Sequence, residues 1–342
     1  MKFAIITFLN LLILSCSSYK KVPTVSEQKA DFVLAFGSCN RTDLPNLLWD
    51  DILKVKPDVW VWGGDNIYAD THDMVALRKM YRQQSDKKEY KELVATTDII
   101  GTWDDHDYGL NDGGIEFKAK AESQQEFLNF MKVPLDSPLR RQEGVYTAKK
   151  YKIKGGEINI IILDTRYFRT PLTPDTETNK RIKPNAYGVG SMLGEVQWNW
   201  LENELEQSRA DFNIIVSSVQ YLSKEHGFEA WGNFPHEVDR LGKLITDSGA
   251  KGVMVLSGDR HISEFSRTTL EGMKYPLIDF TSSGLTHAYR GYTGEPNQYR
   301  VGQVVFTESF GILEFDLRNK KVDFKIVGDN GNVLQTLEQV YE

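Results

Sequence analysis

Short apolar runs rich in β-branched residues recur along this chain, and patterns typical of helices lie between several of them. Runs of this length are typical of buried strands. They lie at Phe32–Phe36, Val59–Trp62, Ile158–Leu163, Ile214–Val216, Gly252–Leu256 and Leu277–Phe280. The helical patterns lie at Leu44–Lys54, Met74–Lys91, Lys118–Met131, Glu195–Gln207 and His236–Ser248. Such alternation predicts an α/β domain built in layers.

The C-terminal part of the chain follows a different pattern. Gly311–Leu317 and Lys321–Val327 flank a short polar turn and predict a closing β-hairpin. Thr170–Met192 and His287–Gln303 are irregular and predict long surface loops, where functional residues often lie. Because we find no internal repeat and no low-complexity linker, we interpret residues 31–342 as one domain.

The first residues read MKFAIITFLNLLILSCSS and resemble the signal of a bacterial lipoprotein. Lys2 supplies the positive start, and the apolar run Phe3–Leu14 is too short to span a bilayer as a mature helix. Cys16 stands where such a signal is cleaved and lipidated. We therefore predict a signal peptide at 1–15, a polar tether at 16–30, and an exported protein attached to the cell envelope membrane through Cys16. A plain secretory signal and an N-terminal anchor are the alternatives.

The composition excludes several classes of protein. Lys and Arg number 41 against 48 Asp and Glu, so the net charge is −7, which argues against nucleic-acid readout. Only one long apolar run exists, which excludes a multi-span membrane protein. Two cysteines do not make a disulfide-stapled scaffold. If Cys16 carries lipid, Cys39 has no partner, and it is either a small buried apolar residue or a thiolate held by a metal.

Polar residues collect at the ends of five expected strands. Sites in open α/β sheets form outside the carboxyl ends of the strands, so we expect these blocks to converge on one crevice. In chain order they are Gly37–Arg41, Gly63–Asp70, Trp103–Tyr108, Asp164–Arg166 and Ser257–His261.

The spacing within the blocks favours metal binding. Asp65 and Tyr68 are three residues apart, so one helical turn would direct both toward one cation. Asp259 and His261 are two apart, so an extended segment would point both to one side. Clustered carboxylates repel one another strongly unless cations are present. Cysteine and tyrosine ligands favour a transition metal such as iron, whereas carboxylates suit calcium, magnesium or manganese.

Each of these residues alone has an ordinary structural explanation. Asp65 could be a helix N-cap, Tyr68 a packing aromatic and His261 a half-buried histidine. The acidic stretch Asp104–Asp107 could be a solvated loop. The coincidence of all five blocks at strand ends favours a functional site over five separate explanations. Surface or structural roles are expected for His72, His226, His236 and His287.

Together the blocks resemble a known enzyme family. GSCNR, GDNIYAD, WDDHDYG and SGDRHISEF are similar to the motifs of PhoD-like phosphatases, the alkaline phosphatase D family of calcineurin-like metallophosphoesterases. The resemblance implies a two-sheet β sandwich flanked by helices, a four-layer α/β/β/α arrangement, with a multinuclear metal site. Family members usually begin with an extra β domain, whereas about 15 residues separate Cys16 from the first expected strand here, so we expect a short form.

The resemblance also implies a set of metal ligands. It makes Cys39 and Tyr68 the ligands of an iron(III), Asp65 a bridge between metals, and Asp105 a ligand of the second metal. The GDRH block contributes two further ligands, Asp259 and His261. Iron and calcium are the expected metals, while manganese, zinc and magnesium stay open.

The expected chemistry is attack of a metal-activated water on a phosphate ester. His106 is the expected proton donor to the leaving alcohol. Arg166, and with it Arg41, are expected to hold a phosphate oxygen. The alternative for Arg166 is an ion pair with Asp164 or another acid.

These expectations describe an exported phosphatase acting on phosphomonoesters, phosphodiesters or both. One alternative is a phospholipase-like phosphodiesterase on lipid or wall polymers, whose substrates could contact the aromatic residues Trp231, Phe234, Tyr289, Tyr292 and Tyr299, although packing is the ordinary explanation of these residues. The other is a metal-dependent binding lipoprotein without turnover. The presence of both His106 and Arg166 favours an enzyme.

Overall fold

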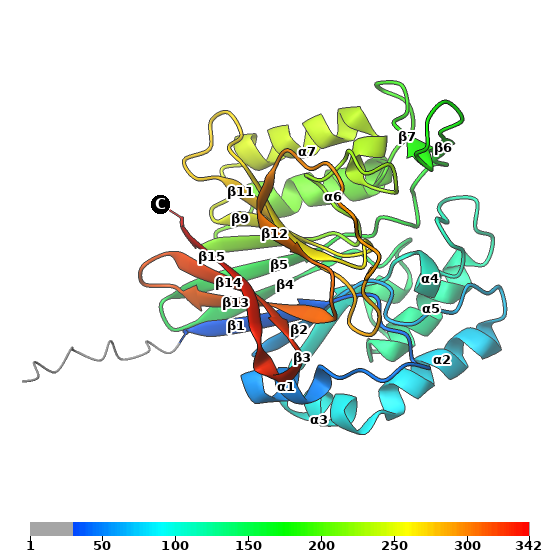
Figure 1. Cartoon of the computed structure of the whole chain (residues 1–342), viewed down its shortest axis with the longest axis horizontal. Coiled ribbons are helices and arrows are strands. Elements are labelled where there is room, and N and C mark those ends of the chain that lie inside the picture. The colour runs from blue at the N-terminus through cyan, green and yellow to red at the C-terminus, as the bar shows by residue number, and fades with distance from the viewer. Residues whose placement is uncertain (1–29, 342) are drawn as a thin grey trace, which may run out of the picture.

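Two β-sheets form the centre of the computed structural model, which describes residues 30–341 (Figure 1). The first sheet has six strands in the order β15 (Val333–Val340), β14 (Lys321–Gly328), β13 (Ser309–Asp316), β1 (Phe32–Gly37), β2 (Val59–Gly63) and β3 (Asp98–Thr102). The second has seven in the order β12 (Arg300–Val305), β10 (Ser263–Thr268), β11 (Leu277–Ser282), β9 (Val253–Ser257), β8 (Phe212–Val216), β5 (Gly156–Ile162) and β4 (Thr147–Ile153).

Helices cover the outer faces of the two sheets (Figure 1). On the six-stranded sheet lie α1 (Trp49–Val55), α2 (Met74–Asp86), α3 (Lys88–Thr96) and α5 (Lys120–Phe130). On the seven-stranded sheet lie α6 (Gly194–Glu206) and α7 (Pro235–Asp247). A one-turn helix, α4 (Asp105–Tyr108), follows β3, and a small hairpin of β6 (Thr173–Pro174) and β7 (Ile182–Lys183) precedes α6.

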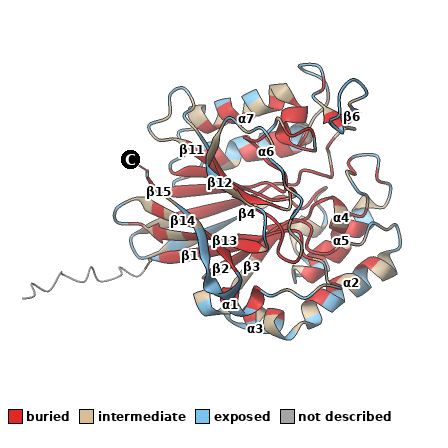
Figure 2. Cartoon of the chain, viewed as in Figure 1, coloured by how far each residue is buried: buried red, intermediate tan, exposed pale blue. Residues whose placement is uncertain are grey.

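The apolar core has three layers, as a four-layer sandwich requires. Alternate residues of β1 and β5, such as Leu34 and Ile160, pack between the sheets. Trp60 and Trp62 of β2 face the helices on one side, and Ile215 of β8 faces α6 and α7 on the other. Figure 2 shows the central strands buried and the helices exposed along one side. The expected α/β/β/α sandwich is therefore confirmed.

Parallel strands occupy the centre of both sheets. β1 pairs in parallel with β2, and β2 with β3. In the second sheet, β5, β8, β9 and β11 run parallel. Because parallel strands share one orientation, the loops that follow them leave from the same edge of each sheet.

The expected strands and the closing hairpin are present, but four strands lack the expected apolar run. β4, β12 and β15 lie at sheet edges and alternate exposed with partly buried residues, and β10 is rich in polar residues. β12 also begins inside the stretch expected to be the loop His287–Gln303, and the β6–β7 hairpin lies inside Thr170–Met192.

The single helix expected over Met74–Lys91 is wrong. Lys87 adopts an extended backbone (φ −59°, ψ 133°), which ends α2 and starts α3. Its backbone N–H still bonds to the Gln84 carbonyl over 3.2 Å, so the chain turns tightly between the helices.

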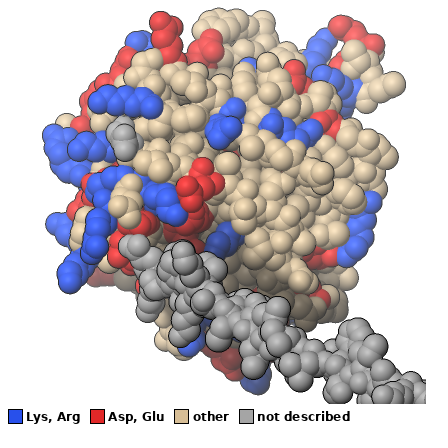
Figure 3. All heavy atoms as spheres, turned by 60° about the vertical axis from the view of Figure 1, so that its left-hand side comes forward, with Lys and Arg blue, Asp and Glu red and all other residues tan. Residues whose placement is uncertain are grey.

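Both ends of the described chain lie on one side of the molecule (Figure 1). Tyr341 packs on Phe212 at the start of β8, with ring centroids 5.5 Å apart. Figure 3 shows this side, where acidic and basic side chains are interspersed. The expected signal peptide, Cys16 and the expected tether up to residue 29 lie outside the described residues. No helix within 30–341 has the length and apolar character needed to cross a bilayer.

Candidate metal centre and active site

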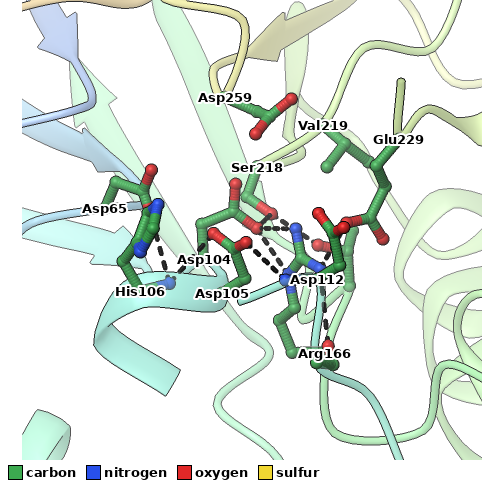
Figure 4. Close-up of polar contacts among 12 residues, drawn as sticks. Asp65, Asp104, Asp105, His106, Asp112, Arg166, Ser218, Val219, Glu229 and Asp259 are labelled. Carbon is green, nitrogen blue, oxygen red and sulfur yellow. Dashed lines mark hydrogen bonds and ion pairs between the residues drawn. The ribbon is translucent and has the colours of Figure 1, made fainter. Parts of the chain in front are cut away.

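The five polar blocks converge at the carboxyl ends of the parallel strands, as expected. The loops after β1 and β2 are joined directly, because Asn40 N–H donates to the Asp65 carbonyl over 2.8 Å. The loop after β9 joins the loop after β8 through Gly258 N–H and the Ser218 carbonyl, 3.0 Å apart. Figure 4 shows Asp104 and Asp105 between Asp65 on one side and Arg166 on the other.

A first cluster contains the lone described cysteine. Cys39 Sγ lies 3.5 Å from Asp65 Oδ2. This sulfur, a carboxylate oxygen of Asp65 and a ring nitrogen of His261 all lie within 4.8 Å of one another. Tyr68 joins them, because its hydroxyl lies 3.0 Å from Asp65 Oδ2 and 3.1 Å from His261 Nε2. Thiol, phenol, imidazole and carboxylate are together a set suited to a transition metal.

Two further clusters adjoin the first. Asp65, Asp105 and His106 bring ligand atoms within 4.8 Å, and so do Asp104, Asp105 and Asp259. Asp65 and Asp105 each belong to two clusters, so the three form one continuous centre. The third cluster is made of carboxylates alone, which are the ligands of hard cations such as calcium or magnesium.

The backbone at this centre is left-handed at several residues, whereas a helical turn was expected at Asp65–Tyr68 and an extended segment at Asp259–His261. No helical turn separates Asp65 from Tyr68; instead Asp65 is left-handed, with φ of 52°. Asp259 and His261 do not lie on an extended segment either, because their φ angles are 63° and 54°. Left-handed backbone is costly for residues other than glycine, and it accumulates at functional sites.

The centre carries more negative charge than the neighbouring side chains neutralise. Burial raises the pKa of Asp65 well above its usual range, and the charges of Cys39 and Asp105 add to the effect. Burial also raises the pKa of Asp104 to about 7 and that of the Cys39 thiol to about 12. Such shifts mark a site that disfavours ionised groups unless a cation is bound.

A buried carboxylate oxygen without a hydrogen-bond partner indicates that a metal ion fits this centre. Asp104 Oδ2 is buried and has no hydrogen-bond partner among residues 30–341. A buried oxygen without a partner costs free energy, which a coordinated cation would recover. The neighbouring Asp105 accepts backbone hydrogen bonds from His106 and Asp112, at 2.9 and 2.6 Å, that fix its orientation.

The short helix α4 sets the direction of this acidic block. Asp107 caps it by accepting the Asp104 N–H over 2.7 Å, and it also accepts Asn66 Nδ2 over 2.6 Å. Asp107 is therefore occupied in holding the loops after β2 and β3 together. Asp105 and His106, at the start of the helix, are left to face the clusters.

Arg166 does not lie where the sequence analysis expected it. Its side chain is 0% exposed. It donates Nε–H to Asp104 Oδ1 over 2.5 Å and Nη1–H to Glu229 Oε2 over 2.6 Å. Glu229 in turn pairs with Arg169 Nε at 2.9 Å. The alternative expected for Arg166, an ion pair with an acidic residue, is therefore present, and Asp104 is a partner. The Arg166 side chain orients Asp104, whereas its expected contact to phosphate stays a prediction.

His106 lies on the open side of the centre. Its ring packs against Tyr68, with centroids 4.1 Å apart, and Nδ1 lies 2.8 Å from an oxygen of Asp70. Burial alone would lower the pKa of His106, but the bond to Asp70 and the charge of Asp105 outweigh it and raise the pKa to about 9. The imidazole is therefore held in one orientation with its Nε2 free to face a bound molecule.

The structure brings in residues that the sequence analysis did not select. His287 was expected to be structural, yet its ring lies 4.4 Å from that of His261 and 4.9 Å from that of Tyr68. Ser283 Oγ lies 3.0 Å from Cys39 Sγ. Asp104 and Glu229 were also missed as members of the centre. The spacing within Asp104–Tyr108 could have suggested Asp104, whereas no local pattern marks the other three.

The remaining histidines stay outside the clusters. His72 packs against Phe117 and His236 against Tyr187, with ring centroids 4.9 and 5.9 Å apart. His226 is buried and accepts the Phe228 N–H over 3.1 Å. These positions agree with the structural roles expected for them.

The layered fold is shared with solved phosphatase structures. A structure described as PhoD superimposes with a TM-score of 0.70 at 17% identity, covering 91% of this chain and 68% of its own. A dimetal phosphatase from Danio rerio superimposes with a TM-score of 0.57 at 14% identity, covering 92% of this chain and 100% of its own. Identities this low show a shared fold alone.

Comparison of the amino-acid sequence with known families identifies the family of this chain. The profile of the family described as PhoD-like phosphatase matches residues 14–324, so the chain belongs to the PhoD-like phosphatases. Alkaline phosphatase D of Bacillus subtilis is 23% identical over 317 residues, covering 78% of this chain and 53% of the relative. The chain thus spans about half the length of the curated relative that it matches. The family resemblance is confirmed.

Proposed function

We propose that the chain is an exported metal-dependent phosphatase that hydrolyses phosphomonoesters, phosphodiesters or both. The observation that carries this proposal is the continuous centre of three clusters, in which the buried Asp104 Oδ2 has no partner among the described residues. Membership of the PhoD-like family supports the reaction class. The substrate type is a proposal, because the chain spans about half of its curated relative.

The donor atoms divide the centre between two kinds of metal. Cys39, Tyr68 and His261, with an oxygen of Asp65, would hold iron, because thiolate and phenolate suit a transition metal. Asp104, Asp105 and Asp259 would hold calcium or another hard cation. Metals bound there supply activation of water at neutral pH and neutralise charge on the phosphoryl oxygens.

His106 is the proposed proton donor to the leaving oxygen. Asp70 holds its Nδ1 at 2.8 Å, so the proton available for transfer sits on Nε2. The carboxylate also stabilises the protonated ring, which must be present before the ester bond breaks. Because His106 also belongs to one of the three clusters, its role needs a test that separates proton transfer from metal binding.

Arg41, rather than Arg166, is the arginine proposed to contact the phosphoryl group. It lies in the loop after β1, two residues beyond Cys39, and its side chain is partly exposed. Its guanidinium pairs with the exposed Asp43 over 2.7 Å, and an exposed pair of this kind is weak enough for a phosphate to compete. Arg166 would act through Asp104 by fixing the direction of that carboxylate.

Export and attachment are proposed from the N-terminal sequence. A lipid on Cys16 would hold the protein at the cell envelope membrane, where phosphate esters outside the cytoplasm are the substrates within reach. The phospholipase-like alternative loses two of the five aromatic residues expected to contact its substrate, because Trp231 and Phe234 are buried.

Metal analysis of the protein without its expected signal peptide tests the proposal. We expect about one iron per chain, and we expect Cys39→Ser to lose that iron together with hydrolysis of chromogenic mono- and diesters. His236→Ala removes a histidine outside the clusters and serves as the control, which should keep both. An active, iron-free protein that tolerates Cys39→Ser would make Cys39 a packing residue and leave manganese, zinc or magnesium as the metal. A metal-loaded protein inactive on every ester would support the binding lipoprotein.

A further inference from the structure

The segment that connects β11 to β12 is fastened to the metal centre at several points. Gly284 and Leu285 donate their N–H groups to the Ser38 carbonyl over 3.2 and 3.0 Å. Tyr289 N–H donates to the carbonyl of His261 over 2.7 Å. These bonds fix the segment relative to the loops that carry the candidate ligands Cys39 and His261.

This segment places His287 at the open side of the centre. The ring of His287 contacts those of Tyr68 and His261, and its Nδ1 lies 3.0 Å from Thr286 Oγ1. No residue within 30–341 forms a hydrogen bond with its Nε2. A molecule held over Tyr68 and His261 would therefore meet this segment on the His287 side.

Three aromatic side chains on and next to this segment form what we call the aromatic rim: Tyr289, Tyr292 and Phe306. Tyr292 stacks on Phe306 with centroids 5.9 Å apart, and Tyr289 meets Tyr292 edge-on at 6.3 Å. Tyr289 is nevertheless 44% exposed and Phe306 42% exposed. Contiguous exposed aromatic surface is unfavourable in water, and where it persists it marks a binding site.

The charged groups around the aromatic rim are already paired. Arg290 forms an ion pair with Glu308, and Arg260 pairs with Glu295 at 2.6 Å. The rim therefore offers flat apolar surface without a surplus of positive charge. Such a surface suits a planar uncharged ring better than a polyanion, because ring faces stack on aromatic side chains without requiring a particular sequence of hydrogen bonds.

We infer that the aromatic rim binds the leaving group of the substrate and that the enzyme prefers phosphate esters whose leaving group carries a planar ring, aryl or nucleobase. The inference rests on the proposed function, because it takes the ester phosphorus to lie at the metal centre. The backbone bond from Tyr289 N–H to the His261 carbonyl carries it, since it fixes the first residue of the rim next to a candidate ligand. Tyr289, Tyr292 and Phe306 are then specificity-determining residues.

Ratios of kcat/KM test the inference independently of the absolute rate. The substrates are 4-nitrophenyl phosphate and adenosine 5′-monophosphate, each compared with glycerol 3-phosphate. We expect Tyr289→Ala and Phe306→Ala to lower the ratio of ring-bearing to glycerol ester at least about 5-fold, mainly through KM, as loss of one stacked ring does. Tyr289→Phe keeps the ring and should restore the ratio. The two ring esters distinguish an aryl from a nucleobase preference.

Tyr187→Ala is the matched control, because Tyr187 is an exposed tyrosine on the connection from β7 to α6, away from the rim. Rim variants that change the ratio no more than this control overturn the inference. If the wild-type protein hydrolyses no ester, the proposed function fails, and calorimetric binding of adenosine 5′-monophosphate then decides. Weaker binding to Tyr289→Ala than to Tyr187→Ala supports the rim, and equal or absent binding overturns it.

Discussion

Arg166 bonds to one oxygen of Asp104 at 2.5 Å, while the other oxygen of that carboxylate is buried without a hydrogen-bond partner among the described residues. One oxygen of Asp104 is thus fixed by the protein, and the carboxylate lies in one cluster with Asp105 and Asp259. A carboxylate held in this way is preorganised, because little conformational freedom is left to lose when a cation binds.

Glu229→Gln should weaken the support of Asp104, because Glu229 bonds to the Arg166 side chain that contacts Asp104. Glu229 holds both Arg166 and Arg169, so its loss leaves buried charge unpaired and should lower the free energy of unfolding by about 3–5 kcal/mol. Calcium should also bind more weakly, because Arg166 loses its second charged partner and is less firmly positioned beside Asp104. Urea unfolding and calorimetric calcium titration measure the two effects. Glu195→Gln breaks an exposed pair with Arg240 and should cost below about 1 kcal/mol. Equal effects of the two substitutions would contradict this account.

His106→Ala should lower kcat by about 10²–10⁴-fold, the range for loss of a general acid, with metal content near that of the wild type. Asp70→Asn should shift the alkaline limb of the kcat profile to lower pH, because the neutral amide no longer raises the pKa of His106. Both are measured by steady-state kinetics with elemental analysis of the same samples. A loss of metal in His106→Ala would instead identify His106 as a ligand.

The metal-free protein should become more stable as pH falls from 8 to about 6.5. Burial raises the pKa of Asp107 to about 8 and that of Asp104 to about 7, so the folded state binds protons in this window that the unfolded state does not. Below pH 6.5 the gain should level off, because buried His226 and His261 have pKa values lowered to about 3, and the two protons that the unfolded chain takes up on them offset the two held by Asp104 and Asp107 in the folded state.

Urea midpoints at several pH values, with and without metal, check this expectation. Asp107→Asn should flatten the change between pH 8 and 6.5, because it removes one of the two carboxyl groups responsible. If the metal-free protein instead becomes more stable as pH rises from 6.5 to 8, the raised pKa values of Asp104 and Asp107 are refuted.

Gly64→Ala should disturb the centre through sterics alone. Gly64 has φ of +98°, and an added Cβ would lie 2.6 Å from Asp104 Cβ, so the acidic loop must move. Gly272→Ala is the control, because its φ is +89° and an added Cβ meets nothing within 4 Å. The control should lose about 1–2 kcal/mol of stability from left-handed strain, and Gly64→Ala more, together with bound calcium. Thermal unfolding and metal analysis compare them, and similar losses in both would show that Asp104 tolerates displacement.

Much of the fold and the positions of the candidate metal ligands could be predicted from local patterns. The central parallel strands are buried on both faces, so each appears as a short apolar run with its polar block directly behind it. Cys39, Asp65 and Asp259 lie in such blocks, and their convergence follows from the parallel arrangement alone. Edge strands such as β15 lack this property, since one face is solvated and neighbours cover little of it.

Other parts of the site depend on contacts that no local pattern encodes. Glu229 lies 63 residues from Arg166 and reaches it only because the segment before α7 folds back over the strand ends. His287 lies in an irregular stretch, and its place beside His261 depends on the bonds from Gly284 and Leu285 to Ser38. The partners of Arg166 could not be predicted for the same reason, because Asp104 and Glu229 come from other loops.

The described chain begins on the side of the molecule opposite the candidate metal centre, which determines how an attached molecule is oriented. β1 runs from Phe32 to Gly37, about 20 Å at the rise of an extended strand, and Cys39 follows at its far end. A molecule immobilised through its amino-terminal side, on a resin or on a lipid layer, therefore presents its reaction centre to the medium and its termini to the support. Esters dissolved in that medium would reach the centre unobstructed, whereas headgroups of the supporting layer itself would lie behind the sandwich.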